Sequence, residues 1–370
     1  MNRRDLLRLP LEAAAGTVAE PFQRSHRPAP GSAPGTLVST PGAQPPRVTV
    51  IGYAPHEMTE HVADDLETLR HMRGKWPVLW VNVDGVAHAE TVERIGEIFC
   101  LHRLGLEDAA HVHQRAKVDV FGDHLLIVAK MARLVPTLDL EQVGIFLGPD
   151  YVVTFQERAG DPLEPVRARI RSGHPRIRCA GADYLAYAIL DAIIDHCFPV
   201  VERYAEELDE IESQVIAHPS RTSVNHLHLI KRDLMSLRRA MWPLREALGN
   251  LLRDPGDLVR PETLVYLRDT HDHVYQIIDL VEAYREVASS LTELYLSTVS
   301  NRMNEVMKVL TMFASIFIPL GFLTGIYGMN IRHPDGAWYW DWPFVLGTMI
   351  ALAAVLVAFF WRRGWLFGDD

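Results

Sequence analysis

Two long stretches without a charged side chain lie close to the carboxyl end of this sequence. Residues 309–327 read VLTMFASIFIPLGFLTGIY, and residues 343–361 read PFVLGTMIALAAVLVAFFW. As a helix, each stretch reaches roughly 28 Å, close to the ~30 Å hydrocarbon thickness of a bilayer. The pattern predicts two transmembrane helices in a chain whose overall composition, with 23% charged residues, is that of a soluble protein.

Basic side chains flank the two predicted spans on one side. They are Arg302, Lys308, Arg362 and Arg363. Only Arg332 lies in the connection at residues 329–342. Because Lys and Arg accumulate on the cytoplasmic side, we expect an extracytoplasmic connection and cytoplasmic termini, including the short tail at residues 362–370. The prediction is a multi-pass protein of the inner (plasma) membrane, in contact with membrane lipid.

The amino-terminal half contains two segments of different composition. Residues 1–46 are rich in Pro, Gly, Ala and Ser without apolar periodicity, so we expect a disordered N-terminal tail. Short β-branched runs and a few helical stretches then predict a cytoplasmic α/β domain over residues 47–160. His56 and His61 are five residues apart, not four, so this stretch does not match the zinc-protease motif.

The following residues are almost wholly helical in pattern. Residues 161–260 carry apolar side chains at helical spacing and predict a cytoplasmic helical region. The next helix begins near Pro261 and meets no stop signal before Gly328. A helix of this length reaches on the order of 100 Å. We therefore expect residues 261–328 to form a stalk that continues into the membrane as the first span.

Composition excludes several classes of function. The net charge of −10 argues against a nucleic-acid partner, which requires a basic surface. Cys100, Cys179 and Cys197 have neither an even number nor a metal-ligand spacing, so we expect no disulfide framework. There is no Gly-x-x-x-x-Gly-Lys phosphate loop, which argues against an ATP-driven pump. We expect no enzyme activity and no organic cofactor.

One face of the first predicted span carries small or weakly polar residues. Steps of three and four residues give Thr311, Ala314, Ile318, Gly321, Gly325 and Gly328. Close helix packing through small residues explains such a face as well as a pore lining does. On the residues alone, both interpretations stay open.

The end of this span carries the sequence Tyr327-Gly328-Met329-Asn330, followed by a short connection and the second span. The arrangement resembles the CorA family of magnesium and cobalt channels, whose Y-G-M-N signature ends the first of two carboxy-terminal transmembrane helices. Further segments resemble the family in the same order, from about residue 47 to the end. They include LEDAAHVHQRAKVDVF, TFQERAGDPLEPVRARIR and YLSTVSNRMNEVMKVLT.

The resemblance implies an α+β membrane protein that forms a homopentameric channel, with a funnel-shaped cytoplasmic domain above the pore. Gly328, Met329 and Asn330 would form the selectivity filter, where amide oxygens can accept hydrogen bonds from hydrated Mg²⁺. By matching positions, the pore-lining residues are Asn304, Met307, Leu310, Ile318, Gly321 and Gly325. Among these, Met307 and Leu310 would form a hydrophobic gate. Gly321 departs from the threonine often found in the family.

The resemblance also implies regulatory Mg²⁺ between subunits, bound by acidic side chains that close the channel. The matching positions are Asp108 with Glu293 of a neighbouring copy, and a second cluster of Glu107, Asp191 and Asp269. Glu293 stands where the family pattern has aspartate, which lengthens that side chain by one methylene.

These features predict passive influx of Mg²⁺, with Co²⁺ and Ni²⁺ as further candidate ions. The membrane potential can drive it, because a divalent ion gains about 4.6 kcal/mol across ~100 mV. A zinc or other transition-metal transporter of the same superfamily is one alternative. A membrane-anchored scaffold is another, but it leaves the small-residue face that leads to Asn330 unexplained.

Overall fold

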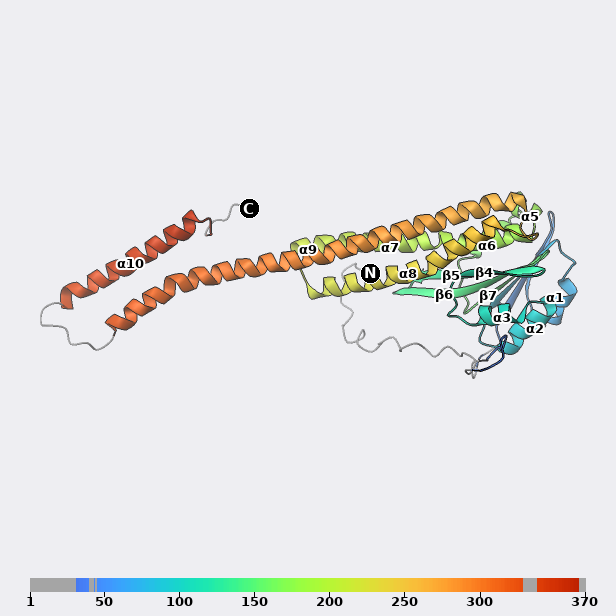
Figure 1. Ribbon diagram of the computed structural model, residues 1–370, viewed down its shortest axis with the longest axis horizontal. Coiled ribbons are helices and arrows are strands. Elements are labelled where there is room, and N and C mark those ends of the chain that lie inside the picture. The colour runs from blue at the N-terminus through green and yellow to red at the C-terminus, as the bar shows by residue number, and fades with distance from the viewer. Residues whose placement is uncertain (1–30, 40–42, 44, 329–337, 366–370) are drawn as a thin grey trace. The chain divides into compact units, whose positions relative to one another are not determined.

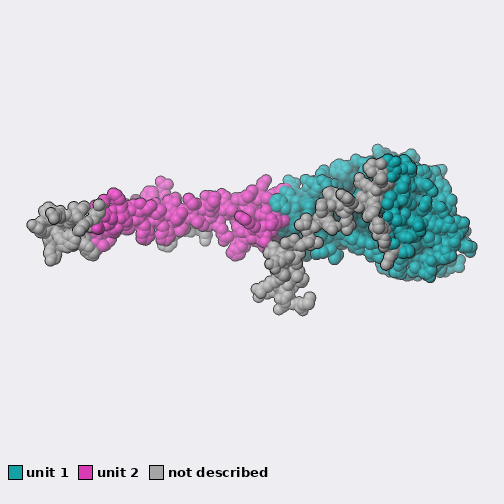
Figure 2. Space-filling model, turned by 90° about the horizontal axis from the view of Figure 1, so that it is seen from below, with its two compact units in different colours: residues 1–210, 226–288 teal, residues 211–225, 289–370 magenta. Residues whose placement is uncertain are grey.

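The computed structural model describes residues 31–39, 43, 45–328 and 338–365. Helices and strands follow one another as Figure 1 shows. The chain forms two compact units, coloured separately in Figure 2. The described residues of the first unit lie within 31–210 and 226–288, and those of the second within 211–225 and 289–365.

The first unit contains a seven-stranded sheet in the order β2-β1-β3-β7-β6-β5-β4. Neighbouring strands are antiparallel except for the central pair β3 and β7, which is parallel. An α/β domain was predicted, and the sheet confirms it. The strands are β1 (Arg47–Tyr53), β2 (Met58–Val62), β3 (Val78–Asp84), β4 (Lys117–Phe121), β5 (His124–Leu134), β6 (Leu138–Leu147) and β7 (Tyr151–Gln156).

The edge strand β2 was not expected from the sequence. It occupies the stretch after His56 and pairs antiparallel with β1. Its five residues are only half-buried or exposed. A short polar edge strand has no apolar run to reveal it, and such strands are common at sheet edges because they discourage pairing with other chains.

Successive side chains of β3 point to two different faces of the sheet. Leu79, Val81 and Val83 lie in the apolar core together with buried residues of α1 (Glu67–Met72), α2 (Ala89–Phe99) and α3 (Arg103–Ala110). Successive side chains of a strand point to opposite faces, so the residues between them face the other layer of helices. β3 and β7 are covered on both faces, which is typical of a parallel pair.

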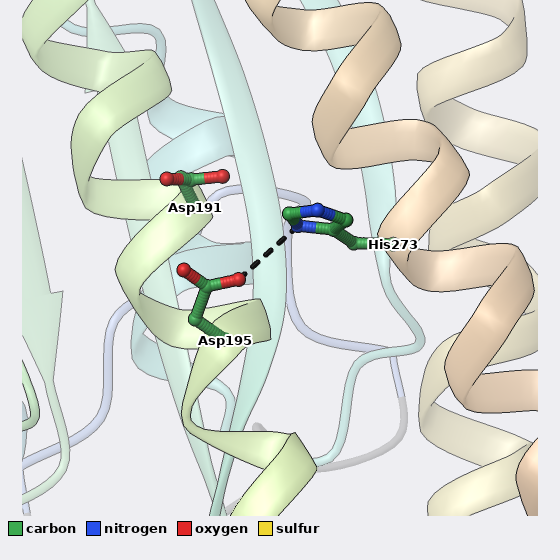
Figure 3. Close-up of side chains that lie close together, drawn as sticks. All are labelled: Asp191, Asp195 and His273. Atoms are coloured by element: carbon green, nitrogen blue, oxygen red, sulfur yellow. Dashed lines mark ion pairs between the residues drawn. The ribbon is translucent and has the colours of Figure 1, made fainter.

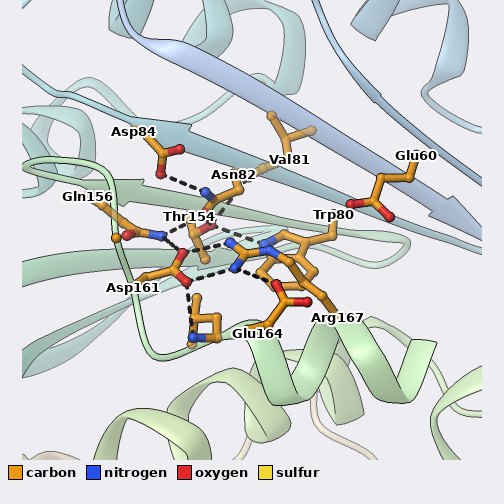
Figure 4. A network of polar contacts seen from close by, with 12 residues as sticks. Glu60, Trp80, Val81, Asn82, Asp84, Thr154, Gln156, Asp161, Glu164 and Arg167 are labelled. Atoms are coloured by element: carbon orange, nitrogen blue, oxygen red, sulfur yellow. Dashed lines mark hydrogen bonds and ion pairs between the residues drawn. The ribbon is translucent and has the colours of Figure 1, made fainter. Parts of the chain in front are cut away.

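On that other face, a buried polar network joins the sheet to α4 (Glu164–Arg171), as Figure 4 shows. Asn82 Oδ1 accepts hydrogen bonds of 2.6 Å from both Thr154 and Gln156. Asp161 accepts two hydrogen bonds from the Arg167 guanidinium, at 2.7 and 2.6 Å. Burial opposes the charge on Asp161, but these hydrogen bonds outweigh it and lower the pKa of Asp161. The network fixes α4 on the sheet.

The remaining helices are long except for the first. They are α5 (Pro175–Cys179), α6 (Ala182–Asp195), α7 (Cys197–Ala217), α8 (Arg221–Arg253), α9 (Pro261–Tyr327) and α10 (Trp338–Arg362). α9 is one continuous helix of 67 residues, as the missing stop signals predicted. Its first turn is held by the buried Asp183 of α6, which accepts hydrogen bonds from Arg260 N at 3.1 Å and Thr263 Oγ1 at 2.5 Å.

Three helical stretches are long and apolar enough to cross a membrane: residues 182–217, 261–326 and 343–362. In the first, 67% of the most apolar window is buried, so this stretch belongs to the domain core. The corresponding windows in α9 and α10 are 0% and 6% buried. Among the described residues, these two helices therefore present apolar surface that is left exposed, as expected for the two predicted spans.

Residues 31–39 belong to the segment for which the sequence predicts disorder, and in the structure they contact the α/β domain. Gly35 N donates to Glu107 Oε2, and Ala89 N donates to Ser39 Oγ. Residues 1–30 of the predicted tail lie outside the described residues.

Helices α7 and α8 share a pH-sensitive contact. His226 Nε2 lies 3.1 Å from Glu207 Oε2, and this hydrogen bond raises the pKa of His226 and lowers the pKa of Glu207. A raised histidine pKa stabilises the fold below the unfolded value of ~6.5, and the benefit is lost as pH rises through the folded pKa. The stabilisation from Glu207 is present above the unfolded glutamate pKa of ~4.3 and is lost as pH falls through its lowered folded pKa.

We expect His226→Gln to lower the melting temperature of the protein at pH 6 and to leave it nearly unchanged at pH 8.5. The loss should be below about 1 kcal/mol, because the side chain of His226 is half exposed and solvent screens the pair. Thermal melts at the two pH values measure it. His228→Gln, an exposed neighbour on α8, is the control, and equal losses at both pH values would contradict the prediction.

Candidate cation sites

The described residues contain one group of three side chains arranged to hold a metal ion, formed by Asp191, Asp195 and His273. Figure 3 shows the two carboxylates of α6 turned toward the imidazole of α9. Their ligand atoms lie within 4.8 Å of one another, and Asp195 Oδ1 is 3.1 Å from His273 Nδ1. We call these three residues the α6–α9 cluster.

The spacing of residues on both helices explains the cluster. Asp191 and Asp195 are four residues apart on α6, one helical turn, so they share a face. Asp269 and His273 have the same spacing on α9, and Asp269 Oδ2 lies 4.0 Å from His273 Nε2. Asp183, which holds the first turn of α9, sets the register in which these two faces meet.

The electrostatics of the cluster favour a cation. Burial raises the pKa of Asp191, and the neighbouring Asp195 carboxylate adds to the rise. Thr270 Oγ1 donates a 3.1 Å hydrogen bond to Asp191 Oδ1 and partly offsets this. A bound cation would remove the repulsion between the two carboxylates. Two carboxylates suit Mg²⁺, whereas the imidazole of His273 suits a borderline metal such as Co²⁺ or Ni²⁺ better.

Sequence reasoning named Asp191 and Asp269 but missed Asp195 and His273. The signal was present as two pairs of possible ligands at i and i+4. Glu107, the third member of the predicted second cluster, lies on α3 and is not part of the α6–α9 cluster. Its participation stays a prediction.

Asp108 already has a cationic partner within its own chain. Lys117 Nζ lies 2.7 Å from Asp108 Oδ2 and 2.6 Å from Asp119 Oδ2. Burial opposes the charge on Lys117, but the hydrogen bonds to these two carboxylates outweigh it and raise the pKa of Lys117. A divalent cation at Asp108 must therefore share this carboxylate with Lys117 or displace it. Glu293, its predicted partner from a neighbouring copy, is exposed on α9.

The predicted pore residues lie along α9 at helical spacing, and their side chains are exposed. Met307, Leu310 and Ile318 are 53%, 59% and 70% exposed, which is unusual for large apolar side chains. Asn304 is exposed as well. A groove on the same helix is lined by Leu310, Thr311, Ala314, Ser315, Ile318 and Pro319. In the part of the chain that the structure describes, this face of α9 is thus continuous and exposed.

The glycines of this face leave open space beside α9. A Cβ added at Gly321 or Gly325 would meet no atom within 4 Å. Thr324 Oγ1 donates a 2.9 Å hydrogen bond to the Gly321 carbonyl. A Cβ at Gly328 would lie 2.8 Å from the Thr324 carbonyl oxygen, so a side chain there would clash with the helix end. Met329 and Asn330 lie outside the described residues.

A turn after the end of α10 brings Trp365 into contact with Lys308 of α9. Gly364, at φ +70°, closes a Schellman motif in which Trp365 N donates to Phe360 O and Gly364 N donates to Trp361 O, both at 2.9 Å. Trp365 stacks on Phe360 with ring centroids 5.5 Å apart. Lys308 Nζ lies over the Trp365 ring at 5.8 Å from its centroid. The turn thus joins the end of α10 to α9 through a cation–π contact.

Two exposed apolar helices of membrane-spanning length indicate a membrane protein, and the α6–α9 cluster offers ligands that suit a divalent cation. The chain belongs to the CorA-like Mg²⁺ transporter protein family, whose sequence model matches residues 77–363.

Individual relatives cover most of the chain. A cobalt/magnesium transport protein CorA of Thermotoga maritima is 42% identical over 341 residues, covering 91% of this chain and 97% of that protein. A putative metal ion transporter of Bacillus subtilis is 34% identical, covering 77% of this chain and 89% of that protein. The solved structure of the complete CorA magnesium transporter from Methanocaldococcus jannaschii shares the fold, with a TM-score of 0.73 at 21% identity, over 86% of this chain and 98% of that one.

Proposed function

We propose that this chain is the subunit of a homopentameric channel that admits Mg²⁺ into the cell, driven by the membrane potential and closed by intracellular Mg²⁺. Family membership and the transport named for its relatives support divalent-cation transport. The observation that carries the channel proposal is the uncovered apolar and small-residue face of α9, because two spans in one chain cannot enclose a pore.

In this proposal, five copies of α9 bring Asn304, Met307, Leu310, Ile318, Gly321 and Gly325 around a central pore. Gly328, Met329 and Asn330 form the filter at its outer end, where amide oxygens bind the water shell of Mg²⁺. The pore is closed where Met307 and Leu310 meet, because a narrow apolar ring excludes water. Both termini and the α/β domain lie on the cytoplasmic side.

Regulatory cations bind to acidic side chains of the α/β domain and its helices. The residues proposed are Asp108 with Glu293 of a neighbour, Glu107, Asp191 and Asp269, together with Asp195 and His273. Bound cations remove repulsion between carboxylates, and their loss favours the open state.

The test is Mg²⁺ uptake into liposomes that carry the purified protein, under an inside-negative potential. We expect flux that millimolar internal Mg²⁺ suppresses. Absence of Mg²⁺ flux at every internal concentration would contradict the proposal. The imidazole of His273 keeps a transition-metal transporter as the second candidate, and uptake of Zn²⁺, Co²⁺ and Ni²⁺ in the same liposomes distinguishes it.

Lys117→Met should raise the affinity of the Asp108 region for Mg²⁺. The substitution keeps the length of the side chain and removes the charge that neutralises Asp108 and Asp119, which leaves two carboxylates without their cation. We expect a lower free energy of unfolding without Mg²⁺. Added Mg²⁺ should then stabilise the variant by about 1–2 kcal/mol more than it stabilises the unmodified protein, as thermal melts with and without Mg²⁺ would show. Lys75→Met, at an exposed lysine, is the control. An unchanged Mg²⁺ response would contradict the prediction.

A further inference from the structure

Residues 33–39, which we call the strap, are held on α2 and α3 by contacts at both ends. Gly35 N donates a 2.6 Å hydrogen bond to Glu107 Oε2 on α3. Ala89 N, at the start of α2, donates a 3.0 Å hydrogen bond to Ser39 Oγ. Between them, Leu37 packs against the apolar core of the α/β domain. The strap therefore satisfies one of the free amides that begin α2.

Docking of the strap requires a glycine at position 35. Gly35 has φ +82°, which costs an ordinary residue roughly 1 kcal/mol or more. A Cβ there would also lie 3.0 Å from Arg103 Cβ, so the strap could not approach α3 as closely. Thr36 Oγ1 closes the turn by donating to Ala33 O at 2.5 Å.

The strap occupies an oxygen atom of a proposed regulatory ligand. Glu107 is partly buried, and its other oxygen, Oε1, lies 3.7 Å from His111 Nδ1. The amide hydrogen of Gly35 carries partial positive charge and points at Oε2. A divalent cation on the Glu107 carboxylate would draw negative charge from this oxygen and repel the amide hydrogen, so each weakens the binding of the other.

We propose that the strap is a built-in competitor of divalent cations for Glu107: it docks while Glu107 is free of cation and is released when a cation binds Oε2. The inference rests on the proposed function in one respect, the assignment of Glu107 as a ligand of regulatory cations. The proposal gives the segment before β1 a role, because cation binding at α3 would free this segment from the α/β domain.

Hydrogen exchange measured by mass spectrometry on the full-length protein in detergent tests the proposal. With saturating Mg²⁺, and separately with Co²⁺, exchange of the strap amides should rise about tenfold or more, as expected when a hydrogen bond to a carboxylate is lost. In Glu107→Gln the side-chain oxygen still accepts from Gly35 but binds cations weakly. The strap of this variant should therefore stay protected with and without cation.

Two glycine variants form a matched pair. Gly35→Ala should leave the strap exchanging fast even without cation. Gly31 has a similar φ of +94° but no atom within 4 Å of an added Cβ, so Gly31→Ala should behave as the unmodified protein does. Equal exchange in the two variants would overturn the proposal, because the contact with α3 would then not hold the strap.

Cation binding to the same samples is measured by equilibrium dialysis. Strap protection that does not change at saturation, or a protein that binds no cation, overturns the inference. Liposome flux is scored separately. A protein without flux whose strap still responds to Mg²⁺ would remove the proposed function and leave the competition between strap and cation in place.

Discussion

Replacing Leu310 with asparagine is expected to produce a channel that intracellular Mg²⁺ no longer closes. Leu310 is 59% exposed in the chain, and in the proposed pentamer five copies meet in the apolar ring that excludes water. Each fully buried leucine side chain contributes about 1.5–3 kcal/mol, so an amide in its place shifts the equilibrium between closed and open states at least about tenfold per copy.

Liposome flux at high internal Mg²⁺ measures the effect, and we expect Leu310→Asn to conduct there about as well as at low internal Mg²⁺. Val309→Asn is the matched control. Val309 is also exposed, at 47%, but one residue along the helix turns it about 100° away from Leu310. If both variants lost Mg²⁺ inhibition equally, a general loosening of α9 would explain the result and the proposed gate would be wrong.

The sequence predicted those helices and strands that a continuous run of residue types marks. Uncharged stretches marked the membrane-length parts of α9 and α10, and β-branched runs marked six of the seven strands in the described part of the chain. The third apolar stretch, residues 182–217, shows the limit of composition. This stretch is largely buried, and its α6 part packs against β5, β6 and β7, so only the packing distinguishes it from a membrane span.

The contacts that the sequence did not reveal join distant residues or depend on register. Glu107 and Gly35 are 72 positions apart, and no local pattern pairs them. Lys117 and Asp108 meet because β4 returns beside the end of α3, which turns a predicted cation ligand into half of an ion pair. His273 could have been found from its i, i+4 relation to Asp269, but the partner Asp195 requires the parallel register of α6 and α9.

The α6–α9 cluster should distinguish cobalt from magnesium through its imidazole. We expect His273→Gln to weaken Co²⁺ binding by at least about tenfold and to change Mg²⁺ binding much less, since imidazole is a good ligand for Co²⁺ and a poor one for Mg²⁺. Asp195→Asn should weaken both ions, because carboxylates serve both. Isothermal titration of the full-length protein in detergent measures the four affinities.

Neighbouring residues on α9 supply the controls. His271→Gln and Asp272→Asn change the same residue types one or two positions away, outside the cluster. Asp191 adds an internal check, since burial and the Asp195 carboxylate raise its pKa. Asp195→Asn should remove that repulsion and stabilise the cation-free protein while it weakens binding. Equal losses of Co²⁺ and Mg²⁺ in His273→Gln would mean that the imidazole orients the carboxylates and does not bind the metal itself.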